Sequence, residues 1–451
     1  MDRKTNDSSR RKFIGNAAAL SVMGALGMGA VISSCRRKPK YTAPVFPDMA
    51  PDGPLLKAGL IGCGSRGTGA AINFLDAGPN LEITALGDIF EHRMDRCRQE
   101  LKENRGIEIP DEKCFLGFDN YKKVIDSGVD VVLLCTPTHF RPAHFEYAVQ
   151  SRKHIFAEKP VAVDPVGLRT VMAAGRMAES AGLNVVAGTQ RRHQRDYLKT
   201  FEMVKNGAIG DLVSANCYWN QGRMWHVDAP RQEGWSDMEA MLRDWVNWNW
   251  LCGDHILDLH IHNLDVVNWF FEKHPVKAVG FGGRHRLERG NHYDFFSTDF
   301  QFDDGRHMHS MTRQIDGCAN NVSEIIYGTK GFTNARNRIV DYKGNLIWQY
   351  EYPVGENGQP MTSVAVSPYV QEHINLVTAI RTDGYINETQ NVCESNMIGI
   401  MGRESAYTGR EVTWEEMMNS SMSLGPKEYK FGPVDPVVVP RIAPVPGTAP
   451  A

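Results

Sequence analysis

The chain comprises 451 residues, of which 42% are hydrophobic and 23% are charged, and its formal net charge is −3. Residues 1–34 contain five of the 50 basic and two of the 53 acidic residues, so the rest of the chain has 45 basic against 51 acidic residues. This balance excludes a protein that binds nucleic acid by neutralising phosphates with an excess of basic side chains. The length suffices for two domains with hydrophobic cores.

The first 35 residues are predicted to be an export signal. Arg10 and Arg11 precede a weakly apolar stretch that is too short and too glycine-rich for a comfortable membrane span. This pattern resembles a bacterial twin-arginine signal, although an ordinary basic signal region also fits the arginine pair. Residues 32–35 resemble a lipoprotein cleavage box, in which Cys35 would become the lipidated first residue of the mature chain. We therefore expect a periplasmic protein that contacts the membrane only through this anchor.

The next segments are a predicted tether and a predicted first domain. Residues 36–54 are basic at first and then rich in proline, a composition that favours an extended tether. From residue 55 to residue 187, short apolar runs alternate with helix-like stretches, which predicts a doubly wound parallel sheet of the Rossmann type. The expected strands have the sequences LKAGLIG, ITALGD, VDVVLLCTP, HIFAEKP and LNVVAG.

A glycine-rich turn with the spacing of the dinucleotide fingerprint follows the first strand; its members are Gly62, Gly64, Ser65, Arg66 and Gly67. Glycines there let the backbone turn tightly, approach a pyrophosphate and start a helix close to the strand. Asp88 ends the next strand, 21 positions after Gly67, the expected distance to a carboxylate that binds the adenosine ribose. Because a carboxylate would repel a 2'-phosphate, the sequence predicts NAD rather than NADP. A solvated loop carboxylate is the alternative for Asp88 alone.

The second half of the chain has a different texture. Residues 188–415 contain longer strand-like runs with polar alternation, which predicts an α+β domain with a large, mostly antiparallel open sheet. Residues 366–382 and 392–408 are expected to be helical and to pack against the core, and residues 416–451 to form a C-terminal arm. The eight cysteines after Cys35 lack a C-x-x-C pair, so we expect buried thiols without disulfides. The ligand should lie between the two domains.

Three motifs occur in an order that is typical of one enzyme family. They are Cys135-Thr136-Pro137-Thr138-His139, Ala157-Glu158-Lys159-Pro160 and Asp258-x-His260-x-His262-x-x-Asp265. Together they resemble the Gfo/Idh/MocA oxidoreductases, a family that includes glucose-fructose oxidoreductase and inositol dehydrogenases. The resemblance extends from about Leu55 to Arg410.

The resemblance implies roles for individual residues. Lys159, Asp258 and His262 would line the nicotinamide ring, and the bond between Lys159 and Pro160 would be cis. Further cofactor contacts are expected at Thr136, Pro137, His139, Glu158 and Pro160. His260 departs from the family pattern, which usually has glycine at this position. This departure bears on how closely a substrate approaches the turn.

The same residues suit hydride transfer on chemical grounds. Oxidation of a carbinol carbon needs a base for the hydroxyl proton and a cation near the developing alkoxide. His262 is the better base because its ordinary pKa is near neutrality, and Lys159, with a pKa depressed beside an oxidised nicotinamide, supplies the cation. On a continuous helix, Asp258 lies one turn before His262 and can orient its imidazole or bind sugar hydroxyls. A helix-surface pair without a catalytic role is the alternative.

His255, Asp258, His260 and His262 together suggest a metal site. A regular helix would point His260 away from His262 and place His255 about 10 Å further along the axis, so we predict no metal unless the backbone is irregular here. His260 is then expected to cap the substrate pocket or to form an outer hydrogen bond, without touching the nicotinamide. Other candidate substrate contacts are Gln190, Arg191 and Tyr218. The tryptophans at 245, 248 and 250 are equally compatible with sugar stacking and with the core.

The leading prediction is an NAD-dependent oxidoreductase that acts on a secondary hydroxyl of a sugar or glycoside, and we expect a homo-oligomer. An exported enzyme cannot easily exchange its cofactor, so NAD would stay bound and be recycled by a second substrate. The first alternative is a glycosidase resembling the NAD-dependent α-N-acetylgalactosaminidases, in which transient oxidation permits elimination of the aglycone. The second alternative is a lipid-anchored sugar-binding protein without turnover.

Overall fold

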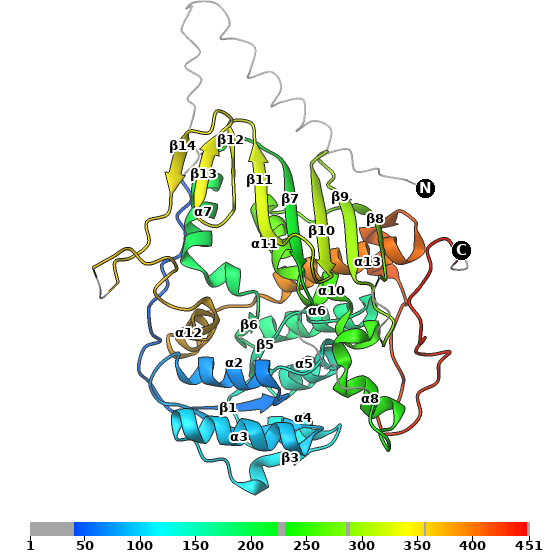
Figure 1. The fold of residues 1–451 in the computed structure, drawn as a ribbon. Helices are drawn as coiled ribbons and strands as arrows, with labels where there is room; N and C mark the ends of the chain where they lie inside the picture. Colours follow the sequence, from blue (N-terminus) through cyan, green and yellow to red (C-terminus); the bar gives the residue numbers. More distant parts are fainter. Residues whose placement is uncertain (1–39, 224–230, 286–288, 356–357, 449–451) are drawn as a thin grey trace, which may run out of the picture. The chain divides into compact units, whose positions relative to one another are not determined.

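The computed structural model describes residues 40–223, 231–285, 289–355 and 358–448 (Figure 1). The predicted signal, residues 1–35, and the start of the predicted tether lie outside these ranges. Within the described part of the chain, no helix is both long enough and apolar enough to cross a membrane.

The first sheet has six strands and confirms the predicted doubly wound fold. Its strands are β1 (Leu56–Ile61), β2 (Leu81–Asp88), β3 (Cys114–Leu116), β4 (Val131–Leu134), β5 (His154–Ala157) and β6 (Val185–Ala187). Their order is β3-β2-β1-β4-β5-β6, and all neighbouring strands are parallel. The strand order reverses between β1 and β4, and open α/β sheets bind dinucleotides at such a switch point, outside the carboxyl ends of the strands.

Helices cover both faces of this sheet. They are α2 (Ser65–Leu75), α3 (Glu91–Arg105), α4 (Asn120–Ile125), α5 (Arg141–Gln150) and α6 (Pro165–Ser180). Leu60 and Ile61 are neighbours in β1 but belong to different core clusters, because successive strand residues point to opposite faces. Leu60 packs in one cluster with α2 and α3, and Ile61 packs in the other with α4, α5 and α6.

The second sheet has nine strands and confirms the predicted mostly antiparallel α+β domain. Its strands are β7 (Leu212–Gln221), β8 (Lys277–Gly283), β9 (Phe295–Gln301), β10 (His307–Gln314), β11 (Asn321–Gly328), β12 (Gly331–Thr333), β13 (Arg338–Asp341), β14 (Leu346–Gln349) and β15 (Val412–Thr413). The order is β14-β13-β12-β11-β7-β10-β9-β8-β15. Only the central β7–β10 pair of this sheet is parallel among the described residues.

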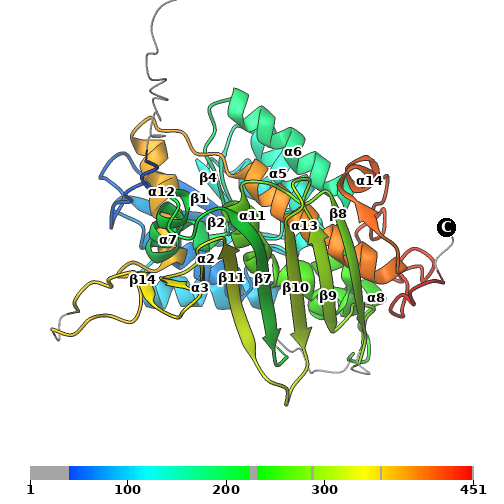
Figure 2. The same ribbon diagram turned by 90° about the horizontal axis from the view of Figure 1, so that it is seen from above.

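One face of the second sheet carries helices and the other is open (Figure 2). The covering helices include α10 (His255–Asp258), α11 (Ile261–Phe271) and α13 (Thr389–Thr408). Cys217 of β7 lies between Ser310 of β10 and Glu324 of β11 in the strand register, and all three are buried beneath the helices. Since side chains alternate along a strand, Trp219 shares this face and Tyr218 faces the open side.

The remaining elements lie between strands of one sheet, between the two sheets, or after β14. The helices are α7 (Arg195–Lys205), α8 (Asp237–Arg243), α9 (Asn249–Cys252), α12 (Pro368–Arg381) and α14 (Trp414–Asn419). Short 3-10 helices are η1 (Asp111–Lys113), η2 (Thr138–Phe140), η3 (Gln190–His193) and η4 (Trp245–Asn247). As predicted for residues 366–382, α12 packs back against the core: Ile374 and Val377 are buried in the cluster of the first sheet that contains Leu60.

Residues 41–54, in the segment predicted as an extended tether, contact later elements of the chain. They contain no helix or strand, but side chains of later elements bind their backbone. Arg195 of α7 donates to the carbonyl oxygen of Phe46 at 3.1 Å, and Arg381 of α12 donates to that of Pro51 at 2.7 Å. Because this segment forms no strand, its carbonyl groups lack ladder partners, and the two arginines supply donors for some of them.

The described cysteines are free thiols. Most are buried or half-buried, as expected, but Cys318 is exposed because it lies in the turn between β10 and β11. Its exposure corrects the prediction that all of these thiols are buried.

Candidate active site

The glycine-rich turn connects the end of β1 to the start of α2. Gly62 has a φ of +97°, and a Cβ atom there would lie 2.7 Å from the backbone of Cys135. A Cβ atom on Gly67 would lie 1.8 Å from the carbonyl oxygen of Gly62. By contrast, no described atom lies within 4 Å of a Cβ built on Gly64. The turn therefore needs glycine at 62 and 67 for its own folding, and the open space at Gly64, beside the first turn of α2, fits an approaching pyrophosphate.

Asp88 ends β2 beside this turn. One of its carboxylate oxygens accepts the N–H of Cys63 at 2.7 Å, and the other accepts the N–H of Phe90 at 2.9 Å. Asp88 thus fixes the glycine-rich turn in addition to any cofactor role. Because an ionised carboxylate has about four acceptor positions, both oxygens can still accept a ribose hydroxyl.

The loops after β4 and β5 carry the next predicted residues, and the side chain of Arg141 links these two loops. The Arg141 side chain is buried and donates to the carbonyl oxygens of both Thr136 and Pro160. The Lys159–Pro160 peptide bond is cis, as the family resemblance implied. Sequence reasoning missed Arg141, although a cation in the first turn of a helix is unfavourable unless another group binds it. The position of Arg141 at the start of a helix therefore indicates that another group binds its guanidinium.

Lys159 and Asp258 lie together in the interior. The Lys159 Nζ donates to the backbone carbonyl of Asp258 and lies 4.0 Å from its carboxylate Oδ1. Burial lowers the pKa of Lys159, and the Asp258 carboxylate opposes this shift. Burial raises the pKa of Asp258, opposed by the charge of Lys159. Both groups are therefore closer to their neutral forms than they would be in water.

The continuous helix expected from Asp258 to His262 is wrong. α10 ends at Asp258 and α11 begins at Ile261. The N–H of His260 bonds to the carbonyl oxygen of His255, five residues earlier, at 3.1 Å. This wider turn changes the direction in which successive side chains point, so that Asp258 reaches Lys159 while His260 points to β10.

His262 lies next to β7. Its ring stacks on Trp219 with the ring centroids 5.9 Å apart. Burial lowers the pKa of His262 well below its ordinary value, and the charges of Lys159 and Arg191 lower it further. The imidazole is therefore neutral near pH 7 and able to accept a proton. Arg191 itself lies over the Trp219 ring, 5.8 Å from its centroid, and forms an ion pair with the buried Glu324.

Two predicted substrate contacts lie elsewhere. His260 is fully buried, and its Nε2 lies 2.7 Å from the hydroxyl of Ser310 on β10. It forms the predicted outer hydrogen bond and does not cap a pocket. Tyr218 faces the open side of the second sheet, away from His262. Its neighbour Trp219, which sequence reasoning passed over, takes the place beside the imidazole.

The histidines of this segment diverge. His255 contacts the hydroxyl of Thr312, whereas His260 contacts Ser310 and Asp258 contacts Lys159. Among the described residues, no group of three or more His, Cys, Asp or Glu side chains could hold a metal ion. The irregular backbone that a metal site required is present, but it separates the side chains.

Arg66 and Gln190 meet through Tyr369. The Arg66 Nε lies 2.5 Å from the Glu158 carboxylate, and the guanidinium lies over the Tyr369 ring, 5.0 Å from its centroid. The Gln190 amide donates to the Tyr369 hydroxyl at 3.4 Å. Tyr369 begins α12 and was not predicted, because it lies far along the sequence from the motifs.

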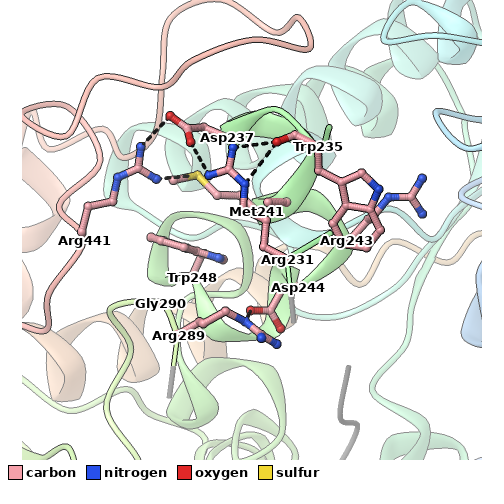
Figure 3. A pocket seen from close by; sticks show the side chains of 11 residues that line it. Arg231, Trp235, Asp237, Met241, Arg243, Asp244, Trp248, Arg289, Gly290 and Arg441 are labelled. Atoms are coloured by element: carbon pink, nitrogen blue, oxygen red, sulfur yellow. Dashed lines mark hydrogen bonds and ion pairs between the residues drawn. The ribbon is translucent and has the colours of Figure 1, made fainter. Parts of the chain in front are cut away.

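The tryptophan-rich segment belongs to the core. Trp248 and Trp250 are buried with Met238 and Met241 of α8, and Trp245 packs against the same cluster. A pocket of about 370 Å³ adjoins this cluster (Figure 3). It is lined by Arg231, Trp235, Asp237, Ala240, Met241, Arg243, Asp244, Trp248, Arg289, Gly290 and Arg441. Its lining does not include Lys159 or His262, so this pocket is separate from the cluster that carries the chemistry.

The parallel sheet, its glycine turn and Asp88 define a dinucleotide-binding domain, and comparison with known proteins agrees. Residues 56–189 match an oxidoreductase family with an NAD-binding Rossmann fold. Residues 197–333 match the GFO/IDH/MocA C-terminal domain. The chain therefore belongs to the Gfo/Idh/MocA family of oxidoreductases, and its first domain is NAD-binding.

Relatives and similar structures carry several activities in their names. The chain is 26% identical over 227 residues to glycosyl hydrolase family 109 protein 1 of Shewanella sp. (strain ANA-3). This match covers 48% of this chain and 47% of the relative. The chain is 29% identical over 155 residues to the myo-inositol 2-dehydrogenase of Thermotoga maritima, which covers 34% and 42%. The matches thus span less than half the length of these relatives. The aldose-aldose oxidoreductase of Caulobacter crescentus has the same fold, with a TM-score of 0.60 at 18% identity, covering 80% of this chain and 99% of that chain.

Proposed function

We propose that the protein is an NAD-dependent oxidoreductase that moves a hydride between the cofactor and a secondary hydroxyl of a sugar or glycoside. One observation carries the proposal: beyond the carboxyl end of β5, Lys159, whose side chain is only 10% exposed, meets the buried Asp258, and the charge of Lys159 acts on the buried His262. This edge of the sheet also carries the glycine-rich turn. The charges and burial of the three side chains match what alcohol oxidation requires.

The chain's residues would divide the work as follows. NAD, when bound, supplies the hydride acceptor. Neutral His262 takes the hydroxyl proton of the substrate, which leaves the oxygen with developing negative charge. Lys159 stabilises that charge from a water-excluded position, where a cation acts more strongly than in water. Asp258 holds Lys159 through its carbonyl group and its carboxylate, and Trp219 fixes the plane of the imidazole.

The test is product analysis. The purified protein is incubated with a mixed panel of sugars and glycosides, and the products are identified by mass spectrometry while the nicotinamide absorbance is followed. A product two hydrogens lighter than its substrate supports the proposal. If acid releases no NAD from the protein and added NAD does not bind, the proposal fails.

A glycosidase is the second candidate, and the similarity to a relative named as a family 109 glycosyl hydrolase favours it. In such a reaction, oxidation is transient and the aglycone is eliminated. The motif Asp258-x-His260-x-His262 differs from the corresponding motif of the NAD-dependent glycosidases. We therefore rank glycosidase activity second. Cleavage of a chromogenic glycoside without net change of the nicotinamide absorbance would establish it. A sugar-binding protein without turnover is the third candidate, and the complete set of Lys159, Asp258 and His262 counts against it.

We also propose that the protein is exported to the periplasm by the twin-arginine route and anchored by a lipid at Cys35. The support is the sequence of residues 1–35, which lie outside the described part of the chain. Cell fractionation of the natural chain and of a variant with Arg10 and Arg11 both replaced by lysine tests the route. A Cys35→Ala variant tests the anchor.

A homo-oligomer is likewise proposed, with the open face of the second sheet as the contact. Phe281 of β8 is 66% exposed, Val279 is 54% exposed and Met311 of β10 is 36% exposed. Phe281 and Met311 both pair with Ser297 of β9, so they share one face. Exposed apolar side chains in a contiguous strip favour protein contacts. Light scattering of the purified chain, with its N-terminal signal removed, measures the oligomeric state.

A further inference from the structure

The C-terminal arm crosses the edge of the first sheet at which a dinucleotide binds. We infer that residues 424–431 form an outer wall of the cofactor site and slow the exchange of NAD. The inference rests on the proposed function, because it requires that the first domain hold NAD in the fully folded chain. Its support is the path that the arm takes over the loops that follow the parallel strands.

The arm begins this path beyond β5. The backbone N–H of Leu424 donates at 2.8 Å to Asp164, which caps the N-terminus of α6. Gly425 then lies against His139, in the loop after β4: with a φ of +87°, a Cβ there would lie 2.6 Å from the Trp250 ring and 2.9 Å from the His139 ring. The chain is therefore in close contact with the β4 loop at this point.

Tyr429 extends the path from the β4 loop to the β3 loop. Its hydroxyl lies 2.8 Å from Nε2 of His139. Its ring meets that of Phe140 with centroids 5.2 Å apart and that of Phe118, which follows β3, with centroids 6.3 Å apart. Burial lowers the pKa of His139 to about 4, so this imidazole is neutral near pH 7 and its bond to the tyrosine joins two uncharged groups.

Phe431 completes the path at β2. Its ring lies 5.5 Å from that of Phe118 and stacks on that of Phe90 at 6.0 Å between centroids. Phe90 follows Asp88 by two residues, and its N–H donates to the Asp88 carboxylate. In chain order, residues 424–431 thus pass the loops after β5, β4, β3 and β2. A dinucleotide bound along this edge lies beside the arm, with its adenosine half on the side of β2.

The far end of the arm is fastened as well. The N–H of Val434 donates to the Asp237 carboxylate of α8 at 3.1 Å, and Arg441 donates to the same carboxylate at 3.0 Å (Figure 3). Val434 and Val439 are buried with Met238 of α8. Because the arm is held on both sides of residues 424–431, departure of the cofactor past it requires local opening of the aromatic contacts.

The experiment uses the full mature chain, loaded with NADH and then mixed with excess NAD, and follows the loss of cofactor fluorescence. The double variant Tyr429→Ala/Phe431→Ala should release NADH about tenfold faster or more, because several aromatic contacts are lost. Tyr429→Phe removes only the bond to His139 and should accelerate release about threefold to tenfold. The matched control is Tyr385→Ala: Tyr385 is 53% exposed, close to the 49% of Phe431, and lies outside the arm.

The outcomes separate the two proposals. Absence of nicotinamide binding by the natural chain contradicts the proposed function. If the natural chain binds NADH but both arm variants release it at the natural rate, the inference about the arm is wrong and the proposed function stands. Tighter binding in the arm variants also overturns the inference, since it would mean that the arm occupies the place of the cofactor. Where the double variant does not fold, the Tyr429→Phe rate decides.

Discussion

At the residue scale, the surroundings of Lys159 and His262 set their chemistry. Both are buried, and burial lowers the pKa of each. Replacing either by alanine should reduce turnover by about a hundredfold or more, the order expected for loss of acid–base catalysis or alkoxide stabilisation, while NAD stays bound. Steady-state kinetics and nucleotide content check this. His307→Ala serves as the control, because His307 lies on β10 with its side chain 47% exposed. Near-normal turnover in both variants would remove them from the mechanism.

A second prediction concerns Asp254 and the pH dependence of stability. Asp254 is fully buried, has a φ of 71° and accepts hydrogen bonds from Tyr407 and from the N–H of Tyr293. Burial raises its pKa to about 7. Its neutral form is therefore favoured in the folded protein, and this stabilisation is complete below the unfolded pKa of about 4 and is lost as the pH rises through about 7.

The consequence appears in the difference between the natural chain and Asp254→Asn, which cannot titrate. The free energy of unfolding of the natural chain, minus that of the variant, should fall by about 3 kcal/mol between pH 5 and pH 8. Urea denaturation at several pH values measures both. A difference that does not change with pH would show that the Asp254 carboxyl is ionised throughout the range.

Single residues also show where sequence reasoning ends. The period-2 pattern of β7 predicts that Tyr218 and Trp219 face opposite ways, yet the sequence does not say which face α11 covers. Tyr218 is therefore the predicted substrate contact, whereas Trp219 is the residue beside His262. The roles of Arg141 and Tyr369 depend on contacts between loops that only the folded chain brings together.

In the turn between β1 and α2, the backbone needs glycine at Gly62 and Gly67, whereas Gly64 has open space beside it. Gly64 has an extended backbone with φ −71° and ψ 177° and open space beside it, so Gly64→Ala should leave the melting temperature nearly unchanged. The added methyl group should lower NAD affinity about tenfold or more, because it stands where the pyrophosphate approaches. Calorimetry of binding and thermal unfolding measure the two effects.

A matched control for Gly64→Ala lies in α2, the helix that follows this turn. A Cβ on Gly69 would have only Arg66 near it, at 3.8 Å. Alanine is preferred to glycine inside a helix by about 1 kcal/mol, so Gly69→Ala should raise the melting temperature slightly and leave NAD affinity unchanged. Equal NAD affinities for Gly64→Ala and the natural chain would contradict the placement of the pyrophosphate.

Elements were predicted well where they are long and periodic. The alternation of apolar runs and helices predicted the doubly wound parallel sheet, and the strands of four or more residues in the first domain were all expected. β3, β12 and β15 have two or three residues, too few for a pattern. The break between α10 and α11 was not foreseen, because no glycine or proline marks it and the contact of His260 with Ser310 of β10 joins residues far apart in the sequence.

Both ends of the described chain, predicted as an extended tether and as a C-terminal arm, are held by contacts with distant parts of the molecule. Residues 41–54 are bound by α7 and α12, and residues 424–441 lie over the first sheet and α8. Such contacts join residues hundreds of positions apart, which composition and periodicity cannot reveal. The family and the NAD-binding first domain follow from motifs, whereas the proposed outer wall at residues 424–431 follows from contacts that only the folded chain makes.

We propose that this chain transfers a hydride from a sugar to a nicotinamide, with Lys159 and His262 as the catalytic groups. The most direct measurement is a single turnover of the NAD-loaded protein with sugars deuterated at their carbinol carbons, followed by mass spectrometry of the released cofactor. We predict that deuterium appears in the nicotinamide for at least one sugar, and that His262→Ala abolishes the transfer. A protein that binds NAD yet shows no deuterium in the cofactor with any sugar of the panel would contradict the account.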